Sequence, residues 1–126
     1  MLSKFFTNIF YVKIYKNKFV VKNISENNEV TLSATQPFTT TRLLVGEFIE
    51  AEKLLTKALN KSSKSKWFSP SPTVVIQPME MAEGGLSGIE LRAIRELAFG
   101  AGARKVLVWE GNVLSNKEVI KNAKNT

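Results

Sequence analysis

The sequence of 126 residues contains no cysteine, no histidine and no aspartate, and each absence excludes a class of site. Without cysteine there are no disulfides and no thiolate metal ligands, and without histidine the commonest catalytic acid–base group is missing. Glutamate is the sole carboxylate side chain, which argues against the clustered carboxylates that hold catalytic metal ions. No apolar run approaches the roughly 18–20 residues of a membrane-spanning helix. We therefore expect no metal site, no cofactor and one domain over residues 1–126.

Basic side chains are in excess, with 18 lysines and arginines against 11 acidic residues and a net charge of +7. The first 25 residues hold five lysines, and no acid precedes Glu26. Such a basic end faces phosphates or an anionic membrane in some proteins and is a solvated surface in others. The charge alone does not choose between these roles.

The first third of the chain has the alternation of apolar and polar residues that is typical of antiparallel strands. Strands are expected over residues 11–15, 19–24 and 30–34, with turns at Lys16–Lys18 and Glu26–Asn28. In front of them, Leu2, Phe5, Phe6, Ile9 and Phe10 recur at helical spacing. Residues 1–9 are therefore a candidate amphipathic segment. The alternative is that Ile9 and Phe10 run directly into the first strand and pack in the core.

Beyond Pro37, helices and strands are expected to alternate. Thr41 or a neighbour would cap a helix through about Asn60, whose apolar stripe is Leu44, Phe48, Ala51, Leu55 and Ala58. Residues 60–69 are polar and lysine-rich, which favours a loop, and residues 73–77 form an apolar run typical of a central strand.

A second helix is expected to start at Ser87, with an inward face made of Leu86, Ile89, Ala93, Ile94, Leu97 and Ala101. Gly100 and Gly102 suit its C-terminal cap, where a positive φ is needed. A buried strand over residues 105–109 and a helix from Ser115 to about Ala123 would follow. The order is three strands, helix, strand, helix, strand, helix. It predicts an α/β domain with a mixed five-stranded sheet and right-handed parallel crossovers in its second half.

Four segments resemble the bacterial actin MreB, the rod shape-determining family. Residues 89–96 and 100–104 resemble its V-E-R-R-A-hydrophobic-R-E helix and the G-A-G-A-R that follows it. Residues 47–55 resemble its D-F-x-x-T-E-K-M-L helix, and residues 69–72 resemble its R-P-S-P motif. Residues 1–5 are similar to the opening of several members, where a short amphipathic helix binds the inner membrane. The resemblance implies a ribonuclease-H-like, actin-like fold corresponding to the first MreB domain only.

The chain departs from MreB where that family holds nucleotide. The family carries an acid and D-x-G-T on its first hairpin, whereas Lys13 and Tyr15 stand at those positions here. Lysine cannot ligate magnesium, and a tyrosine side chain would block the close approach of backbone to phosphate. The chain also ends sixteen residues after Glu110, without a second phosphate loop. We therefore expect no enzymatic activity.

Glu90 falls on the glutamate of V-E-R-R-A, which in the family helps to position the attacking water. A structural role is equally explicit, since Ser87 and Glu90 form the S-x-x-E pattern of a capping box. With no phosphate loops in the sequence, capping is the favoured role, and Glu90 would be a vestigial family position.

The resulting expectation is a non-catalytic, MreB-like domain of the cytoplasm that acts through protein or weak peripheral membrane contacts, beside MreB-type filaments or other cell-shape proteins. Candidate contact residues are Leu2, Phe5, Phe6 and Ile9 near the start, and Trp67 and Phe68 in the basic loop. One alternative is a non-specific nucleic-acid-binding module, which we expect less. Another is half of a split ATPase that a partner chain would complete.

Overall fold

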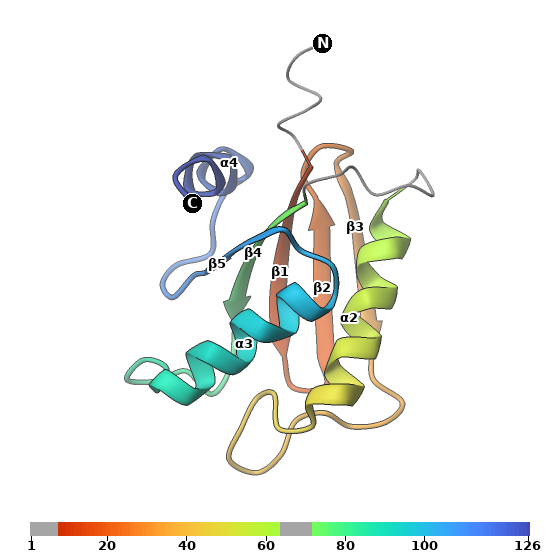
Figure 1. Cartoon of the computed structure of the whole chain (residues 1–126), viewed down its shortest axis with the longest axis vertical. Coiled ribbons are helices and arrows are strands. Elements are labelled where there is room, and N and C mark those ends of the chain that lie inside the picture. The colour runs from red at the N-terminus through yellow and green to blue at the C-terminus, as the bar shows by residue number, and fades with distance from the viewer. Residues whose placement is uncertain (1–7, 64–71) are drawn as a thin grey trace.

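The computed structural model describes residues 8–63 and 72–126, and it is a small α/β domain (Figure 1). Its strands are β1 (Ile9–Tyr15), β2 (Lys18–Asn23), β3 (Asn28–Ser33), β4 (Thr73–Pro78) and β5 (Lys105–Val108). Its helices are α2 (Phe48–Ser62), α3 (Gly88–Gly100) and α4 (Asn116–Lys124). The predicted order of elements is thereby confirmed. No helix within these residues is long and apolar enough to cross a membrane.

The five strands form one mixed sheet in the order β3-β2-β1-β4-β5. The first three strands pair antiparallel, while β1 and β4 run parallel, as do β4 and β5. Tight turns connect the antiparallel strands, and helices connect the parallel ones, as a parallel pairing requires. The strands β1, β4 and β5 consequently end at the same edge of the sheet, the lower edge in Figure 1.

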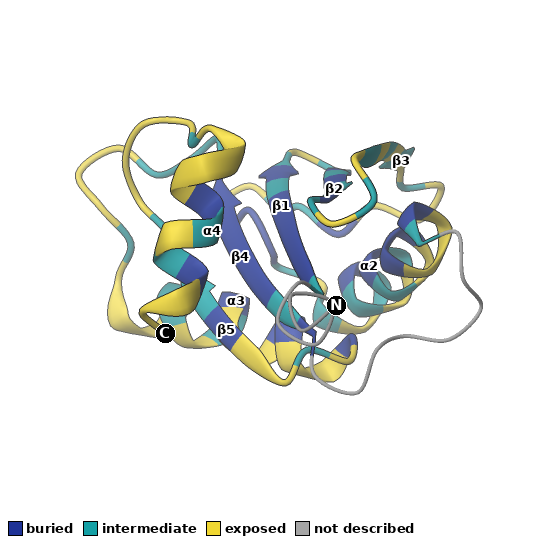
Figure 2. Ribbon diagram, turned by 90° about the horizontal axis from the view of Figure 1, so that it is seen from above, coloured by how far each residue is buried: buried dark blue, intermediate teal, exposed yellow. Residues whose placement is uncertain are grey.

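The two faces of the sheet are covered unequally (Figure 2). Helices α2 and α3 pack on one face, over a large core that includes Phe10, Phe19, Leu55 and Leu97. On the other face, α4 packs on β4 and β1, over a smaller cluster of buried residues. Burial of one face of each amphipathic helix is the main apolar stabilisation of such a layered domain.

The start of β1 resolves the two roles considered for Ile9 and Phe10. Both lie in β1, where Ile9 is 4% exposed and Phe10 fully buried. The expectation that they pack on the sheet is confirmed, and a membrane or partner contact through Ile9 is wrong. Ile9 has no surface to offer because α4 covers it. Leu2, Phe5 and Phe6 lie outside the described residues, as do Trp67 and Phe68.

The first helix begins later than predicted, at Phe48 instead of near Thr41. Hydrogen bonds hold the preceding segment in an irregular path: the Asn17 side chain accepts from the backbone N–H groups of Phe38 and Thr39, both at 2.8 Å. The Phe38 ring also stacks on Phe19, with centroids 4.8 Å apart. Leu44 is buried as expected, but from this loop and not from a helix.

Two details of α3 differ from prediction. Ile89 is expected to face inward, yet it is 80% exposed, because the buried residues of α3 begin only at Ile94, more than one turn later. Gly100 is still helical, so the positive φ that ends this helix belongs to Gly102, at 116°. Gly100 has a packing role instead, since the Glu52 side chain of α2 lies directly against it.

Candidate functional site

The C-terminal ends of β1, β4 and β5 form the edge at which open α/β sheets bind their ligands. Three connections meet there: the β1–β2 turn, the loop from Pro78 to Ser87, and the segment after Val108. This edge also corresponds to the expected position of an MreB-like phosphate site. The side chains and backbone groups at this edge are therefore the ones that would bind a nucleotide.

Protein groups already occupy the β1–β2 turn. The backbone N–H of Lys16 donates to a carboxylate oxygen of Glu80 at 2.7 Å, and the N–H of Asn17 donates to the Thr39 hydroxyl at 2.9 Å. Asn17 itself adopts a positive φ of 55°, which asparagine tolerates in tight turns. Backbone N–H groups in such a turn are the donors that cradle phosphate in nucleotide-binding loops. Here the Glu80 carboxylate accepts from one of these N–H groups.

Glu110, two residues after the end of β5, is used in the same way. One of its carboxylate oxygens accepts a hydrogen bond of 3.0 Å from the Leu86 N–H, which ties this segment to the loop before α3. Two of the carboxylates nearest the edge, those of Glu80 and Glu110, thus satisfy backbone donors of neighbouring loops. Among the residues that the structure describes, no three acidic side chains gather as a metal site would require.

Glu90 closes the capping box that the sequence predicted. Its side chain accepts from the Ser87 N–H at 2.9 Å, and its own N–H donates to the Ser87 hydroxyl at 3.2 Å. The reciprocal pair satisfies two of the N–H groups that a helix start leaves without partners. Capping therefore accounts for the carboxylate without a ligand.

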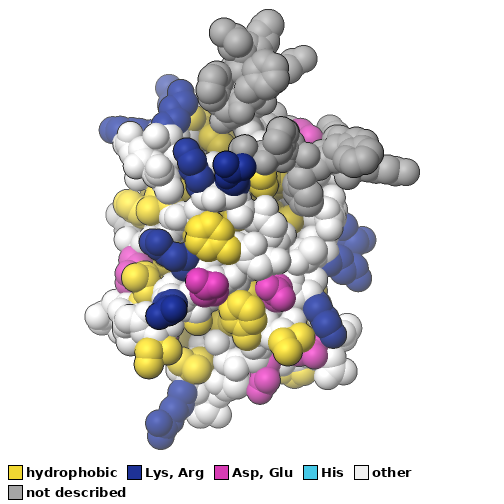
Figure 3. Space-filling model, in the orientation of Figure 1, with side chains coloured by type: hydrophobic (Ala, Val, Ile, Leu, Met, Phe, Trp, Pro, Cys, Tyr) yellow, Lys and Arg dark blue, Asp and Glu magenta, His cyan; other side chains and the backbone are white. Residues whose placement is uncertain are grey.

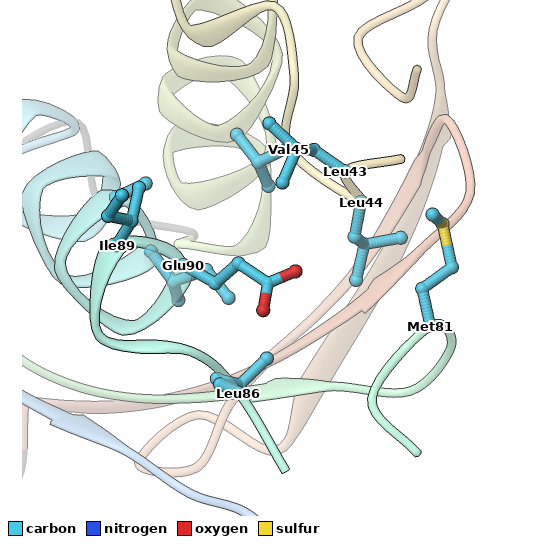
Figure 4. A pocket seen from close by; sticks show the side chains of 9 residues that line it. Leu43, Leu44, Val45, Met81, Leu86, Ile89 and Glu90 are labelled. Carbon is cyan, nitrogen blue, oxygen red and sulfur yellow. The ribbon is translucent and has the colours of Figure 1, made fainter. Parts of the chain in front are cut away.

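The same carboxylate also lies in an apolar groove that the sequence did not reveal. The groove runs between the loop before α2, the loop after β4 and the first turns of α3, and we call it the α3 groove. Its lining residues are Leu43, Leu44, Val45, Met81, Leu86, Ile89, Glu90, Ala93 and Ile94. Figure 4 shows the Glu90 side chain extending toward the space between Leu44, Val45 and Leu86.

Part of the α3 groove is open to solvent. Ile89, on α3, is 80% exposed and Leu43, on the loop before α2, is 37% exposed, so the groove has apolar side chains open to solvent on two of its sides. On the face that carries α2 and α3, hydrophobic and acidic side chains lie together in the lower half, toward the C-terminal edge (Figure 3). Exposed apolar side chains around a polar group are typical of a surface that contacts another protein.

A buried hydrogen-bond network connects β1 and β4 to the segment between β5 and α4. The Tyr11 hydroxyl donates to the Gln77 side-chain oxygen and accepts from the Leu114 N–H at 3.1 Å, and the Gln77 amide nitrogen donates to the Gly111 carbonyl at 2.8 Å. Burial raises the pKa of Tyr11 above its ordinary value, and the charges of Tyr15 and Glu118 add to the rise, while the bond from Leu114 opposes it. The network anchors the segment that leads into α4.

Comparison with known proteins places the chain in a family. No protein-family model matches it. It is 34% identical over 99 residues to the uncharacterized protein YjaA of Escherichia coli (strain K12), covering 75% of this chain and 76% of that protein. The chain belongs to the YjaA family.

This YjaA-family chain is also similar to part of an MreB protein. It is 34% identical over 67 residues to the cell shape-determining protein MreB of Pasteurella multocida (strain Pm70). That similarity spans 53% of this chain but only 18% of MreB. The MreB resemblance seen in the motifs is therefore partial and suggestive. It concerns this chain and does not extend to the whole of MreB.

Proposed function

We propose that this YjaA-family chain is a non-catalytic, actin-like domain that binds proteins of the cell-shape machinery on the cytoplasmic side of the inner membrane. The observation that carries the proposal is the 67-residue similarity to a cell shape-determining protein. The strand order β3-β2-β1-β4-β5 agrees with the ribonuclease-H-like fold that the MreB resemblance implies. The partner that fits best is an MreB-type filament.

The absence of catalysis in this proposal rests on the β1–β2 turn. Tyr15 ends β1, and Glu80 accepts from the Lys16 N–H that a phosphate would need. An incoming phosphate would meet a carboxylate of like charge, and like charges a few ångströms apart repel strongly when partly buried. One carboxylate oxygen of Glu90 is engaged in capping α3, and this role accounts for the residue without a part in hydrolysis.

The proposed contact surface is the α3 groove. Its exposed rim, Ile89 and Leu43, would be covered by apolar side chains of the partner. The Glu90 carboxylate within the groove would accept a hydrogen bond from a basic or amide group of that partner. A few residues near the centre of an interface commonly carry most of its binding energy.

Co-sedimentation with filaments of MreB from the same host tests the proposed partner. The perturbing variant is Ile89→Asp, which places a charge in the groove. The matched control is Ile49→Asp: both isoleucines are second residues of their helices, Ile49 is 66% exposed, and it does not line the groove. An acid at this position interacts favourably with the helix dipole, so both variants should fold. We expect the parent and Ile49→Asp to pellet with filaments and Ile89→Asp to lose at least about tenfold in affinity, or about 1.4 kcal/mol.

Two results would contradict the proposal. If the parent chain stays in the supernatant at all filament concentrations, the filament is not the partner. If both aspartate variants bind as the parent does, the α3 groove is not the contact surface. Calorimetry with magnesium and ATP tests the non-catalytic part separately. We expect no binding heat at millimolar ATP, and a micromolar dissociation constant would show that the Lys16–Glu80 bond gives way to phosphate.

A further inference from the structure

The second face of the sheet is only half covered, and its free half is basic. Helix α4 lies over β4 and β1, while β2 and β3 extend beyond it (Figure 2). The strand register places Lys13 and Tyr15 of β1 and Lys18, Val20 and Lys22 of β2 on this face. All five side chains are partly exposed. We call them the β1–β2 basic face.

The register brings the three lysines together. Val20 is the direct partner of Lys13, so Lys18 and Lys22 are its two diagonal neighbours on the adjacent strand. Diagonal positions in an antiparallel pair are roughly 7–8 Å apart. Lys16, exposed in the β1–β2 turn, lies at the end of the same hairpin. The arrangement concentrates positive charge on two neighbouring strands.

These ammonium groups contact aromatic rings. The Lys13 nitrogen lies 5.4 Å from the centre of the Tyr11 ring, and the Lys18 nitrogen lies 4.6 Å from the centre of the Tyr15 ring. Such contacts hold the cations in place but do not neutralise them. Like charges at this spacing repel one another, and a bound polyanion would relieve this repulsion.

The composition of the face favours a hydrated polyanion over a bilayer. Binding of a membrane surface depends on apolar side chains that enter the lipid. Among the described residues, the exposed large hydrophobic side chains are Leu43, Ile49, Ile89, Phe99 and Val113, all on other elements. On β3, beside the lysines, the register adds the exposed Glu29, Thr31 and Ser33. The two hydroxyls are suited to phosphate and sugar contacts. Glu29 is the direct partner of Lys22, so the face keeps an excess of positive charge, with three lysines against one carboxylate.

We propose that the β1–β2 basic face binds single-stranded nucleic acid without sequence preference. Lys13, Lys18 and Lys22 contact phosphates, and Tyr15 offers a ring at the edge of the face on which a base stacks. Positive charge combined with an accessible aromatic ring is the usual basis of such binding. This activity uses a surface on the opposite side of the sheet from the α2–α3 layer that borders the α3 groove, so it is independent of the filament contact.

Fluorescence anisotropy with a labelled oligothymidylate tests the proposal on the full chain. Three phosphate contacts on a single strand give a log–log salt slope of about −2, which is a loss of roughly 20-fold in affinity between about 50 and 200 mM salt. The perturbing variant is Lys13→Gln/Lys18→Gln/Lys22→Gln. The matched control is Lys53→Gln/Lys57→Gln/Lys61→Gln, which removes the same charge from exposed positions on α2.

We expect the β1–β2 variant to lose at least about tenfold in affinity at low salt, with a salt slope near zero, and the α2 variant to stay within about threefold of the parent. Circular dichroism melts establish that both variants are folded. Tyr15→Leu serves as a second variant, which should weaken binding while leaving the salt slope unchanged. Equal losses in the two triple variants would show that total charge, and not this face, attracts the strand. Absence of oligonucleotide binding with retained pelleting on phosphatidylserine vesicles would overturn the proposal in favour of a membrane surface.

Discussion

Replacing Tyr11 by phenylalanine removes one hydroxyl from the network that joins β1, β4 and the segment before α4. The hydroxyl has two partners, the Gln77 side-chain oxygen and the Leu114 N–H. Gln77 is 1% exposed, so its oxygen would lose its partner without gaining water. A buried polar group left without a hydrogen bond costs about 1–3 kcal/mol. The Leu114 N–H is nearer the surface and adds up to about 1 kcal/mol.

The expected loss in unfolding free energy is therefore about 1–4 kcal/mol, a large share of the total for a small domain. Urea unfolding followed by circular dichroism measures it, and a drop in melting temperature of roughly 4 °C per kcal/mol should accompany it. Tyr15→Phe is the matched control, because the Tyr15 ring meets Lys18 through its face and not through its hydroxyl. A surface change of this kind should stay within about 0.5 kcal/mol of the parent.

The outcome that refutes the reasoning is a Tyr11→Phe variant within about 0.5 kcal/mol of the parent. That result would mean that water reaches Gln77 and that the network does not anchor α4. Equal losses of unfolding free energy in Tyr11→Phe and Tyr15→Phe would point to a general effect of removing a tyrosine hydroxyl. That result would also count against a specific contribution of the network.

The remaining predictions concern Tyr11 ionisation, the α3 cap and the β1–β2 turn. Because burial raises the pKa of Tyr11, the unfolded chain loses the Tyr11 proton at a lower pH than the folded chain does. The unfolding free energy should therefore fall as pH rises above about 10. Urea melts at alkaline pH should show a shallower fall in Tyr11→Phe than in the parent. In denaturant melts, Ser87→Ala should lower the unfolding free energy by about 0.5–2 kcal/mol. Glu90→Gln should lower it much less, since glutamine also closes a capping box. A larger loss in Glu90→Gln than in Ser87→Ala would contradict the capping role. Asn17→Gly should cost about 1–3 kcal/mol of unfolding free energy, because the side chain's two hydrogen bonds to backbone N–H groups are lost. Asn17→Ala should cost about 1 kcal/mol more, because alanine adopts the positive φ of this position less readily. Equal stability of the parent and Asn17→Gly would count against the role of the Asn17 side chain.

Features encoded within a few residues of each other were predictable from the sequence. The pairs Ser87–Glu90 and Ser115–Glu118 both form capping boxes, because a cap requires only residues three apart in the chain. The element order followed from apolar periodicity for the same reason. Of Gly100 and Gly102, both predicted for the cap of α3, only Gly102 has a positive φ.

Boundaries set by distant contacts were not predictable. The apolar spacing of Leu44 with Phe48 extended the predicted helix toward Thr41. In the structure, the N–H groups of Gly46 and Glu47 instead donate to the Phe38 carbonyl. The Asn17 side chain in turn holds the backbone of residues 38–39 from more than twenty positions away. Ile89 fits the inward face by spacing, yet the neighbours that would have covered it lie elsewhere in the folded chain. Periodicity identifies which residues are able to be buried, and packing decides which of them are.

The sequence by itself determined the α/β class and the helix caps, and it has Lys13 and Tyr15 where the MreB family has an acid and a glycine. Only the tertiary structure decided that Glu80 accepts from the Lys16 N–H, 64 residues apart in sequence, and that Tyr11 meets Gln77, 66 residues apart. It also brought Leu43, Met81 and Ile89 into one groove and Lys13, Lys18 and Lys22 onto one free sheet face. The physical reason is that each residue's chemistry and its local structural preferences can be read from a short stretch of sequence. Which distant residues come into contact depends instead on strand register and crossover connections, which no short stretch contains.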